Sequence, residues 1–354
     1  AVVVSYYGGG GLRGKPFSLL CREAGVPFRA LCPARFGDLM YWAEDEFEGN
    51  RELRSLLSLP APRLSANEIE TTVADLQPSG LATNSGAVAR ARRGTKLSVI
   101  TYRTTRMLAQ RCYGRLRGYQ FARTGYSVWS NAAFMYRQRR HWRELEQHAT
   151  RDIESLQNRK FVYFPLQQEP EASTLVLSPE HPNQEATLIE LSLSLPADCT
   201  LVVKEHLWQV GRRPDGFYRR ISEIPNVLLI HPEASSLMLI KMAALVCTIS
   251  SSAGYESAVL GQRTVFFWKR ALLSVVGHVH ALARFAPAET LPNLLSESTD
   301  ANVAERENDG AVILRRLRQF CFDLSPLKIH GRQQPPSQEE LDVLLLPMLR
   351  SLTS

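Results

Sequence analysis

The chain has 354 residues, of which 44% are hydrophobic and 22% are charged, and its formal net charge is +7. This length suits two domains of ordinary size, and near-average glycine and proline contents exclude a collagen-like or grossly disordered chain. A charged residue or a proline interrupts every apolar run before it reaches the roughly 18 residues that span a bilayer. The opening AVVVSYY is too short for a secretory signal and lacks an initial Met. We therefore expect a soluble cytoplasmic protein and note that its N-terminus is compatible with trimming or truncation.

The first half of the chain begins with an α/β pattern. We predict a strand over residues 1–7, a glycine-rich loop over 8–14, a helix over 15–25 and a second strand over 27–33. The pattern then weakens into helices and loops over 49–85. Arg and Leu recur over 101–143 without strand alternation, which predicts helix there.

Basic residues are concentrated in this half. Residues 1–150 hold 22 Lys or Arg against 12 Asp or Glu. No acidic residue occurs between Asp75 and Glu144, whereas fourteen basic residues lie from Arg90 to Arg143. Because guanidinium suits phosphate and carboxylate oxygens, we expect the Arg-rich segment 90–143 to face a membrane surface, an acidic glycan, a phosphorylated ligand or nucleic acid. A merely solvated Arg-rich face is the alternative, and the lack of a nucleic-acid reading module argues against nucleic acid.

The second half alternates short apolar runs with segments of helical spacing. The predicted strands are FVYFP (161–165), LVVK (201–204), NVLLI (226–230), LVCTIS (245–250) and TVFFW (264–268). The predicted helices are 184–195, 215–224, 235–244 and 253–261, and a further short apolar helix is expected at 342–352. Continuously apolar strands that alternate with helices are typical of a doubly wound parallel sheet. Together with the α/β start of the first half, this predicts two Rossmann-like domains that face a cleft.

Polar residues follow each predicted strand of the second half. Ligands of such sheets bind beyond the carboxyl ends of the strands, so these residues converge on one edge. They are Gln167, Gln168, Glu169 and Glu171, then Lys204, Glu205 and His206, then His231 and Glu233, then Ser250 to Glu256, and finally Lys269 and Arg270.

The serine-rich turn Ser250-Ser251-Ser252-Ala253-Gly254 is the sharpest of these features. It lies between a buried strand and a helix, where exposed backbone N–H groups attract phosphate. Gly254 permits close backbone approach, and Glu256, expected in the first helical turn, can accept two ribose hydroxyls. The alternative is that the serines cap the helix and Glu256 complements its dipole.

Two further strand ends carry candidate groups. Lys204 can neutralise a phosphate or carboxylate, and His206 can hydrogen-bond a phosphate or transfer a proton. His231 is a weaker candidate, because His-Pro is also an ordinary turn start.

In the first half, Gly9 and Gly10 lie in a loop that lets a donor or an acceptor approach the backbone, with a flexible turn as the alternative. Asp45, in the acidic run 44–46, is a weak candidate for a catalytic base, although such a run is more often a solvated face. We find no D-x-D metal motif, and the scattered cysteines form neither a zinc nor a disulfide pattern.

The region Phe161–Trp268 resembles bacterial capsular polysaccharide biosynthesis proteins, a family of GT-B glycosyltransferases. The matching pieces are FVYFPLQQEPEAST, LPADCTLVVKEHLWQVGRRPDGFYRRI, IPNVLLIHPEASSLMLI and LVCTISSSAGYESAVLGQRTVFF. The chain departs from the family pattern at five positions. Gln167 and Glu169 stand where the family usually has His and Gln, Leu207 replaces a Pro, and Ser251 and Ser252 replace Gly and Thr.

The resemblance implies a metal-independent glycosyltransferase without a cofactor, which moves a sugar from a nucleotide sugar such as CMP-Kdo to a capsular polysaccharide or a glycolipid. It implies that donor-binding residues lie at Lys204, Glu205, His206, Ser250, Ser251, Ser252, Gly254 and Glu256. An epimerase or hydrolase of nucleotide sugars on the same fold, or a non-enzymatic binder of anionic ligands, remains an alternative. We expect an acceptor-side domain over 1–155, a nucleotide-sugar-binding domain over 156–300 and a helical tail over 301–354, with peripheral contact at the inner membrane.

Overall fold

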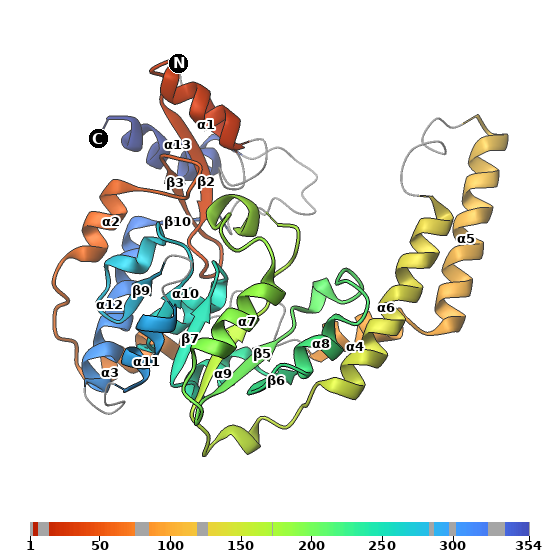
Figure 1. Cartoon of the computed structure of the whole chain (residues 1–354). Coiled ribbons are helices and arrows are strands. Elements are labelled where there is room, and N and C mark those ends of the chain that lie inside the picture. Colours follow the sequence, from red (N-terminus) through yellow and green to blue (C-terminus); the bar gives the residue numbers. More distant parts are fainter. Residues whose placement is uncertain are drawn as a thin grey trace.

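The computed structural model describes residues 3–5, 14–74, 85–118, 127–171, 173–282, 287–296, 302–324 and 337–353. The chain forms two sheets with helices around them, and a long helical hairpin extends from this body (Figure 1). The predicted α/β fold with a doubly wound parallel sheet is confirmed. Gly9 and Gly10 lie outside the described residues.

The larger sheet has six parallel strands in the order β6-β5-β4-β7-β8-β9. This is the doubly wound order, in which the chain starts at β4, winds to one side and then returns to wind to the other. All five predicted strands are present, and the short β9 is one that the sequence did not reveal. The bounds are β4 Phe161–Pro165, β5 Thr200–Lys204, β6 Val227–Ile230, β7 Leu245–Thr248, β8 Thr264–Phe266 and β9 Val279–Ala281.

Helices bury both faces of this sheet, because successive strand residues point to opposite sides. Val162 and Phe164 of β4 pack with helices on one face, whereas Phe161 and Tyr163 pack with helices on the other. The first face is covered by α6 (Val128–His148), α7 (Gln184–Ser194), α8 (Phe217–Ser222) and α11 (Pro287–Ser296), and the second by α9 (Ser236–Met242) and α10 (Ser252–Val259). The four predicted helices are confirmed as α7 to α10.

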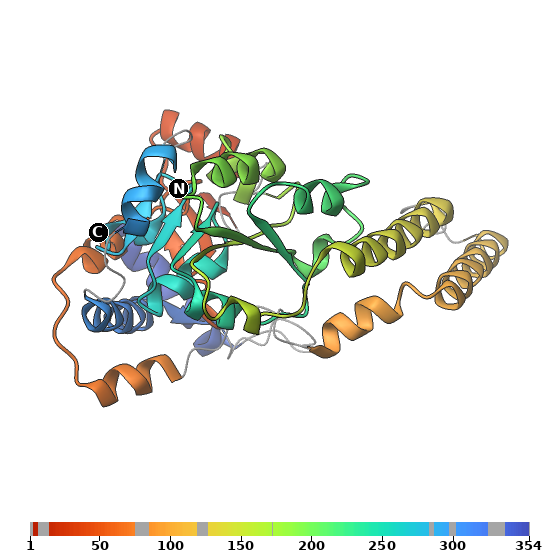
Figure 2. The same cartoon turned by 60° about the horizontal axis from the view of Figure 1, so that its bottom comes forward.

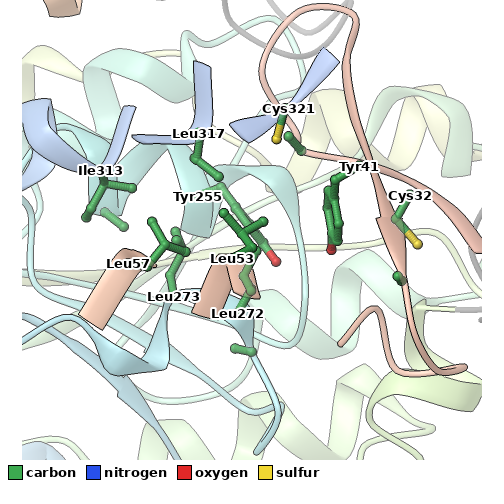
Figure 3. Packing of buried hydrophobic residues seen from close by; sticks show 14 of the residues in the cluster. Cys32, Tyr41, Leu53, Leu57, Tyr255, Leu272, Leu273, Ile313, Leu317 and Cys321 are labelled. Atoms are coloured by element: carbon green, nitrogen blue, oxygen red, sulfur yellow. The ribbon is translucent and has the colours of Figure 1, made fainter. Parts of the chain in front are cut away.

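The smaller sheet has the order β1-β2-β3-β10, with bounds β1 Val3–Ser5, β2 Phe28–Pro33, β3 Leu39–Ala43 and β10 Phe322–Asp323. Only β1 and β2 are parallel, because β3 and β10 run antiparallel to their neighbours. The sheet shares a core with the larger unit, in which Tyr41 of β3 meets Tyr255 of α10, Leu273 and Leu317 (Figure 3). Helix α1 (Gly14–Glu23) follows β1, as predicted.

The Arg-rich segment is helical, as predicted. It comprises α4 (Ser85–Arg93), α5 (Leu97–Leu116) and α6, and the last two form a hairpin that projects from the body in both views (Figures 1 and 2). The base of α6 packs on α8, and Val88, Trp142 and Leu145 join the core of the larger sheet. This segment is therefore anchored on the larger unit and not on the smaller sheet.

The remaining helices lie around the smaller sheet and the shared core. They are α2 (Arg51–Ser58), α3 (Ala66–Ala74), α12 (Val303–Phe320) and α13 (Gln338–Thr353). Short helical turns elsewhere in the fold are η3 (Glu154–Leu156) and η5 (Leu207–Gln209), which pack on the larger sheet, and η4 (Ser173–Leu177) and η6 (Leu272–Val275). The apolar helix expected at 342–352 is α13, which docks on β3 through Leu344 and Met348. The tail also supplies β10 to the sheet. The segmentation at residues 155 and 300 stays a prediction.

Candidate functional site

The loops after β4 and β7 meet where the strand order of the larger sheet reverses. Open α/β sheets bind ligands in the crevice at this point. Gln167 follows β4 and is buried, and its backbone N–H and carbonyl bind the side-chain carboxamide of Gln184 at the start of α7. The carboxamide oxygen of Gln167 faces the serine turn after β7, where it accepts hydrogen bonds from the backbone N–H groups of Ser250 and Ser251 at 3.0 and 2.5 Å. Gln167 therefore fixes the serine turn from the neighbouring strand.

No side chain of the described residues caps the N-terminus of α10. Ser251 is its N-cap residue, but the Ser251 hydroxyl makes no capping hydrogen bond and instead lies 2.7 Å from the Thr248 hydroxyl. Within the part of the chain that the structure describes, the backbone N–H groups of Ser252 and Ala253 have no acceptor. The alternative in which serine side chains cap this helix is therefore wrong, and unpaired N–H donors at a helix start attract anions.

Lys204 and Glu256 are both buried and interact electrostatically beside this turn. Lys204 ends β5, its side chain is 4% exposed, and its Nζ donates to the Ser236 hydroxyl at 2.7 Å. Burial lowers the pKa of Lys204 to about 8, and the nearby Glu256 carboxylate opposes this shift. Glu256 is itself 5% exposed. The expectation that Glu256 lies in the first helical turn is wrong, because α10 begins at Ser252 and Glu256 is one turn further along.

Glu205 is held by a residue that the sequence did not single out. Both carboxylate oxygens of Glu205 bind the buried Arg213 guanidinium, at 2.9 and 3.0 Å. Arg213 also bonds the carbonyl of Gln167 and pairs with Glu169. The carboxylates hold the pKa of Arg213 above its usual value even though burial lowers it. Glu205 and Glu169 therefore act through Arg213, which ties the loops after β4 and β5 together.

Arg213 could not be recognised from the sequence because it lies in GRRPDG, which has the composition of an ordinary turn.

His206 is a neutral group at neutral pH. Burial lowers its pKa below the ordinary value, and the nearby carboxylates of Glu205 and Glu171 only oppose this shift. The buried Nδ1 atom of His206 has no hydrogen-bond partner among the described residues. The imidazole can therefore exchange a proton or a hydrogen bond with a ligand, but it supplies no positive charge, and that task falls to Lys204.

Gly254 and His231 have packing roles in the structure. A Cβ atom at Gly254 would lie 2.6 Å from both Phe266 and Thr248, so the close approach it permits is that of α10 to the sheet. His231 is fully buried, 3.2 Å from Arg151 and in contact with Trp142. Burial and the Arg151 charge lower its pKa to about 4, so the ring is neutral and enclosed.

Asp45 stabilises a turn of the smaller unit. One of its oxygens accepts hydrogen bonds from the backbone of Phe47 and Gly49, both at 2.9 Å. The other lies 3.9 Å from Arg270, in the loop after β8. Neither contact brings Asp45 to Lys204 or Glu256, so the structure gives it a role in fixing the loop that faces the larger sheet.

A metal centre has no counterpart in the described ranges, where no group of three His, Cys, Asp or Glu residues could hold an ion.

Comparison with known sequences assigns the family. The sequence model described as "Capsule polysaccharide biosynthesis protein" matches residues 83–298, which is more than half of the chain. The match includes the residues described above at the point where the strand order reverses, which we call the switch-point site: Gln167, Lys204 to His206, Arg213 and Ser250 to Glu256. The chain belongs to this family. No curated protein matches its sequence.

Solved structures with some similarity include two enzymes of Thermosulfurimonas dismutans KpsC. For the beta Kdo 2,4 transferase the identity is 14% over 98% of this chain and 86% of that chain, with a TM-score of 0.40. For the beta Kdo 2,7 transferase the identity is 13% over 99% of this chain and 85% of that chain, with a TM-score of 0.39. The co-structure of S. aureus MnaA with UDP is 9% identical over 95% of this chain and 99% of that chain, with a TM-score of 0.35. The family assignment rests on the match of residues 83–298.

Proposed function

We propose that the chain is a glycosyltransferase that binds a nucleotide sugar at the switch point of the larger sheet. The observation that carries this proposal is the combination of the open N-terminus of α10 with the buried pair Lys204 and Glu256 beside it. A phosphate needs N–H donors and a balancing cation, and a nucleoside adds hydroxyls that a carboxylate can accept. Membership in the capsule polysaccharide biosynthesis family supports a sugar-transfer reaction.

In this proposal each residue has a defined task. The backbone N–H groups of Ser252 and Ala253 bind phosphate oxygens, and Lys204 balances the charge that develops on the departing nucleotide. Glu256 accepts ribose hydroxyls. Neutral His206 exchanges a proton or a hydrogen bond with the donor or the acceptor.

Arg213 acts as a positioning residue. It holds Glu205 next to His206, and the backbone N–H of His206 donates to Glu205 at 2.6 Å. Substituting Arg213 should therefore alter the geometry of His206 without removing a group that touches the nucleotide.

The acceptor in this proposal is a surface polysaccharide or a glycolipid, and the donor class includes CMP-Kdo. The smaller unit lies across from the larger sheet at the loop of Asp45 and Arg270, where closure would exclude water and suppress hydrolysis of the donor.

A thermal-shift screen tests the proposal and identifies the donor. The melting temperature of the chain is measured with CMP, UDP, GDP and their sugar conjugates. One nucleotide class should raise it through binding to the folded state. The donor that binds is then incubated with and without a glycan acceptor. Transfer only with acceptor supports the proposal, whereas an altered sugar without acceptor indicates an epimerase or hydrolase. No stabilisation by any nucleotide would refute it.

A further inference from the structure

The helical hairpin α5–α6 carries exposed aromatic and apolar side chains on its outer faces. On α5, Tyr102, Tyr113 and Leu116 recur at helical spacing, and Leu116 is 87% exposed. On α6, Trp129 and Tyr136 share a face in the same way, and Trp129 is 70% exposed. Side chains of this size exposed together on a projecting element indicate a surface that is covered in use.

Arginines accompany these side chains on the same faces. Arg106 lies between Tyr102 and Tyr113 on α5, and Arg140 and Arg143 continue the face of Trp129 and Tyr136 on α6. Exposed basic residues of the hairpin that pair with no acidic side chain in the described ranges are Arg103, Arg106, Arg115, Arg117, Arg137 and Arg143. From Leu97 to Arg143 the sequence contains no Asp or Glu. On the outer faces Arg140 pairs with Asp215, whereas Arg106 and Arg143 carry positive charge that no acidic side chain of the described ranges balances.

The combination of residues distinguishes between anionic partners. Trp and Tyr are enriched where a protein meets the headgroup region of a bilayer, and arginines bind its phosphates while their stems cover apolar surface. The outer faces are convex helix surfaces that contain no Asp, Glu, Asn or Gln to bind sugar hydroxyls. They consist of Tyr102, Arg106, Ala109, Tyr113 and Leu116 on α5 and of Trp129, Ala133, Tyr136, Arg140 and Arg143 on α6. A flat anionic surface with an apolar interior fits these faces better than a polysaccharide chain does.

We propose that the outer faces of α5 and α6 dock this protein on an anionic phospholipid surface, with Trp129, Tyr113 and Leu116 in the interfacial layer. The chain is thereby held at a membrane without crossing it, and no described helix is long and apolar enough to cross. This inference is independent of the proposed function, because no residue of the switch-point site takes part in the contact.

Vesicle binding tests the charge contribution. The full chain is titrated with vesicles of phosphatidylglycerol and phosphatidylcholine, and with vesicles of phosphatidylcholine alone. The double substitution Arg106→Gln/Arg143→Gln should weaken binding to the anionic vesicles about 25-fold, since each basic residue near such a surface contributes about fivefold. Binding should also weaken as salt is raised. The matched control Arg159→Gln/Lys241→Gln, which removes the same charge from exposed positions outside the hairpin, should leave it unchanged.

Quenching by brominated lipid tests the apolar contact. Trp129 and Trp208 are the two exposed tryptophans, because Trp42, Trp142 and Trp268 are buried. Brominated acyl chains should quench the fluorescence of the parent chain and of Trp208→Phe, but not that of Trp129→Phe. Each variant is checked for an unchanged melting temperature and unchanged nucleotide binding, which separates this test from that of the proposed function.

Three outcomes would overturn the inference. They are no binding to anionic vesicles, equal binding by the parent and Arg106→Gln/Arg143→Gln, and equal quenching in the parent and Trp129→Phe. If the double variant instead loses affinity only for polygalacturonate, an acidic polysaccharide, the hairpin binds glycan and the lipid proposal is wrong.

Discussion

The affinity of the switch-point site for a nucleotide should fall as the pH rises above about 8. Burial lowers the pKa of Lys204 to about 8, and an arriving phosphate stabilises its charged form. At pH 7 the side chain is about nine-tenths protonated, and at pH 9 about one-tenth, so binding at pH 9 must take up a proton. Nucleotide phosphates have a second pKa near 6, so above pH 8 they are almost fully ionised and add little to the pH dependence.

The magnitude follows from this linkage. Above pH 8 the association constant should decrease by close to tenfold for each pH unit, which corresponds to about 1.36 kcal/mol. Titration calorimetry in buffers of different ionisation enthalpy should show little proton uptake at pH 7 and close to one proton at pH 9.

Two variants make the test specific. Lys204→Met should bind the nucleotide more weakly and without this pH dependence, whereas Lys241→Met, at an exposed lysine, should behave as the parent does. A parent affinity that is flat between pH 7 and pH 9.5 would refute the role of Lys204.

Three further predictions concern stability, measured as the free energy of unfolding in denaturant. Gly254→Ala should lower the free energy of unfolding by about 1–3 kcal/mol, because the added Cβ overlaps Phe266 and Thr248 of the sheet. Gly277→Ala should be neutral or stabilising, because no atom lies within 4 Å of the added Cβ there. Equal effects of the two substitutions would contradict this packing. Arg213→Met should cost about 3–5 kcal/mol because it leaves the Glu205 charge buried, and adding Glu205→Gln should recover part of that loss. The pKa of His231 is lower in the folded chain than in the unfolded chain, so the free energy of unfolding should fall by about 2 kcal/mol from pH 7 to pH 5. His231→Gln should lack this part of the pH dependence. If His231→Gln keeps the pH profile of the parent, the prediction is wrong.

The sequence predicted the larger sheet because its strands are buried on both faces. Runs such as FVYFP and TVFFW leave no other assignment when helical spacing follows each one. Short strands of the smaller sheet were not recognised, because β10 has two residues and β3 follows a tight turn at Arg35–Asp38. Their pairing depends on residues about 280 positions apart, such as Met40 and Phe322, which local patterns do not reveal.

The candidate site was predicted in position more than in role. Topology alone brings the ends of β4, β5 and β7 to one edge, so Gln167, Lys204 and the serine turn could be placed there from the sequence. The chemical role of each of these residues depends on its burial and on its hydrogen-bond and charge partners in the folded chain. The sequence could not show that His206 is neutral or that Glu205 is engaged by Arg213, because both follow from desolvation in the folded chain.

Nucleotide binding by the parent chain and by Glu256→Ala, measured by titration calorimetry, tests the central claim most directly. The parent should bind one of CMP, UDP or GDP. Glu256→Ala should lose most of that affinity, while Glu223→Ala, at an exposed carboxylate outside the site, should retain it. If the parent binds none of these nucleotides, or if Glu256→Ala binds as tightly as the parent does, the switch point of the larger sheet is not a nucleotide site.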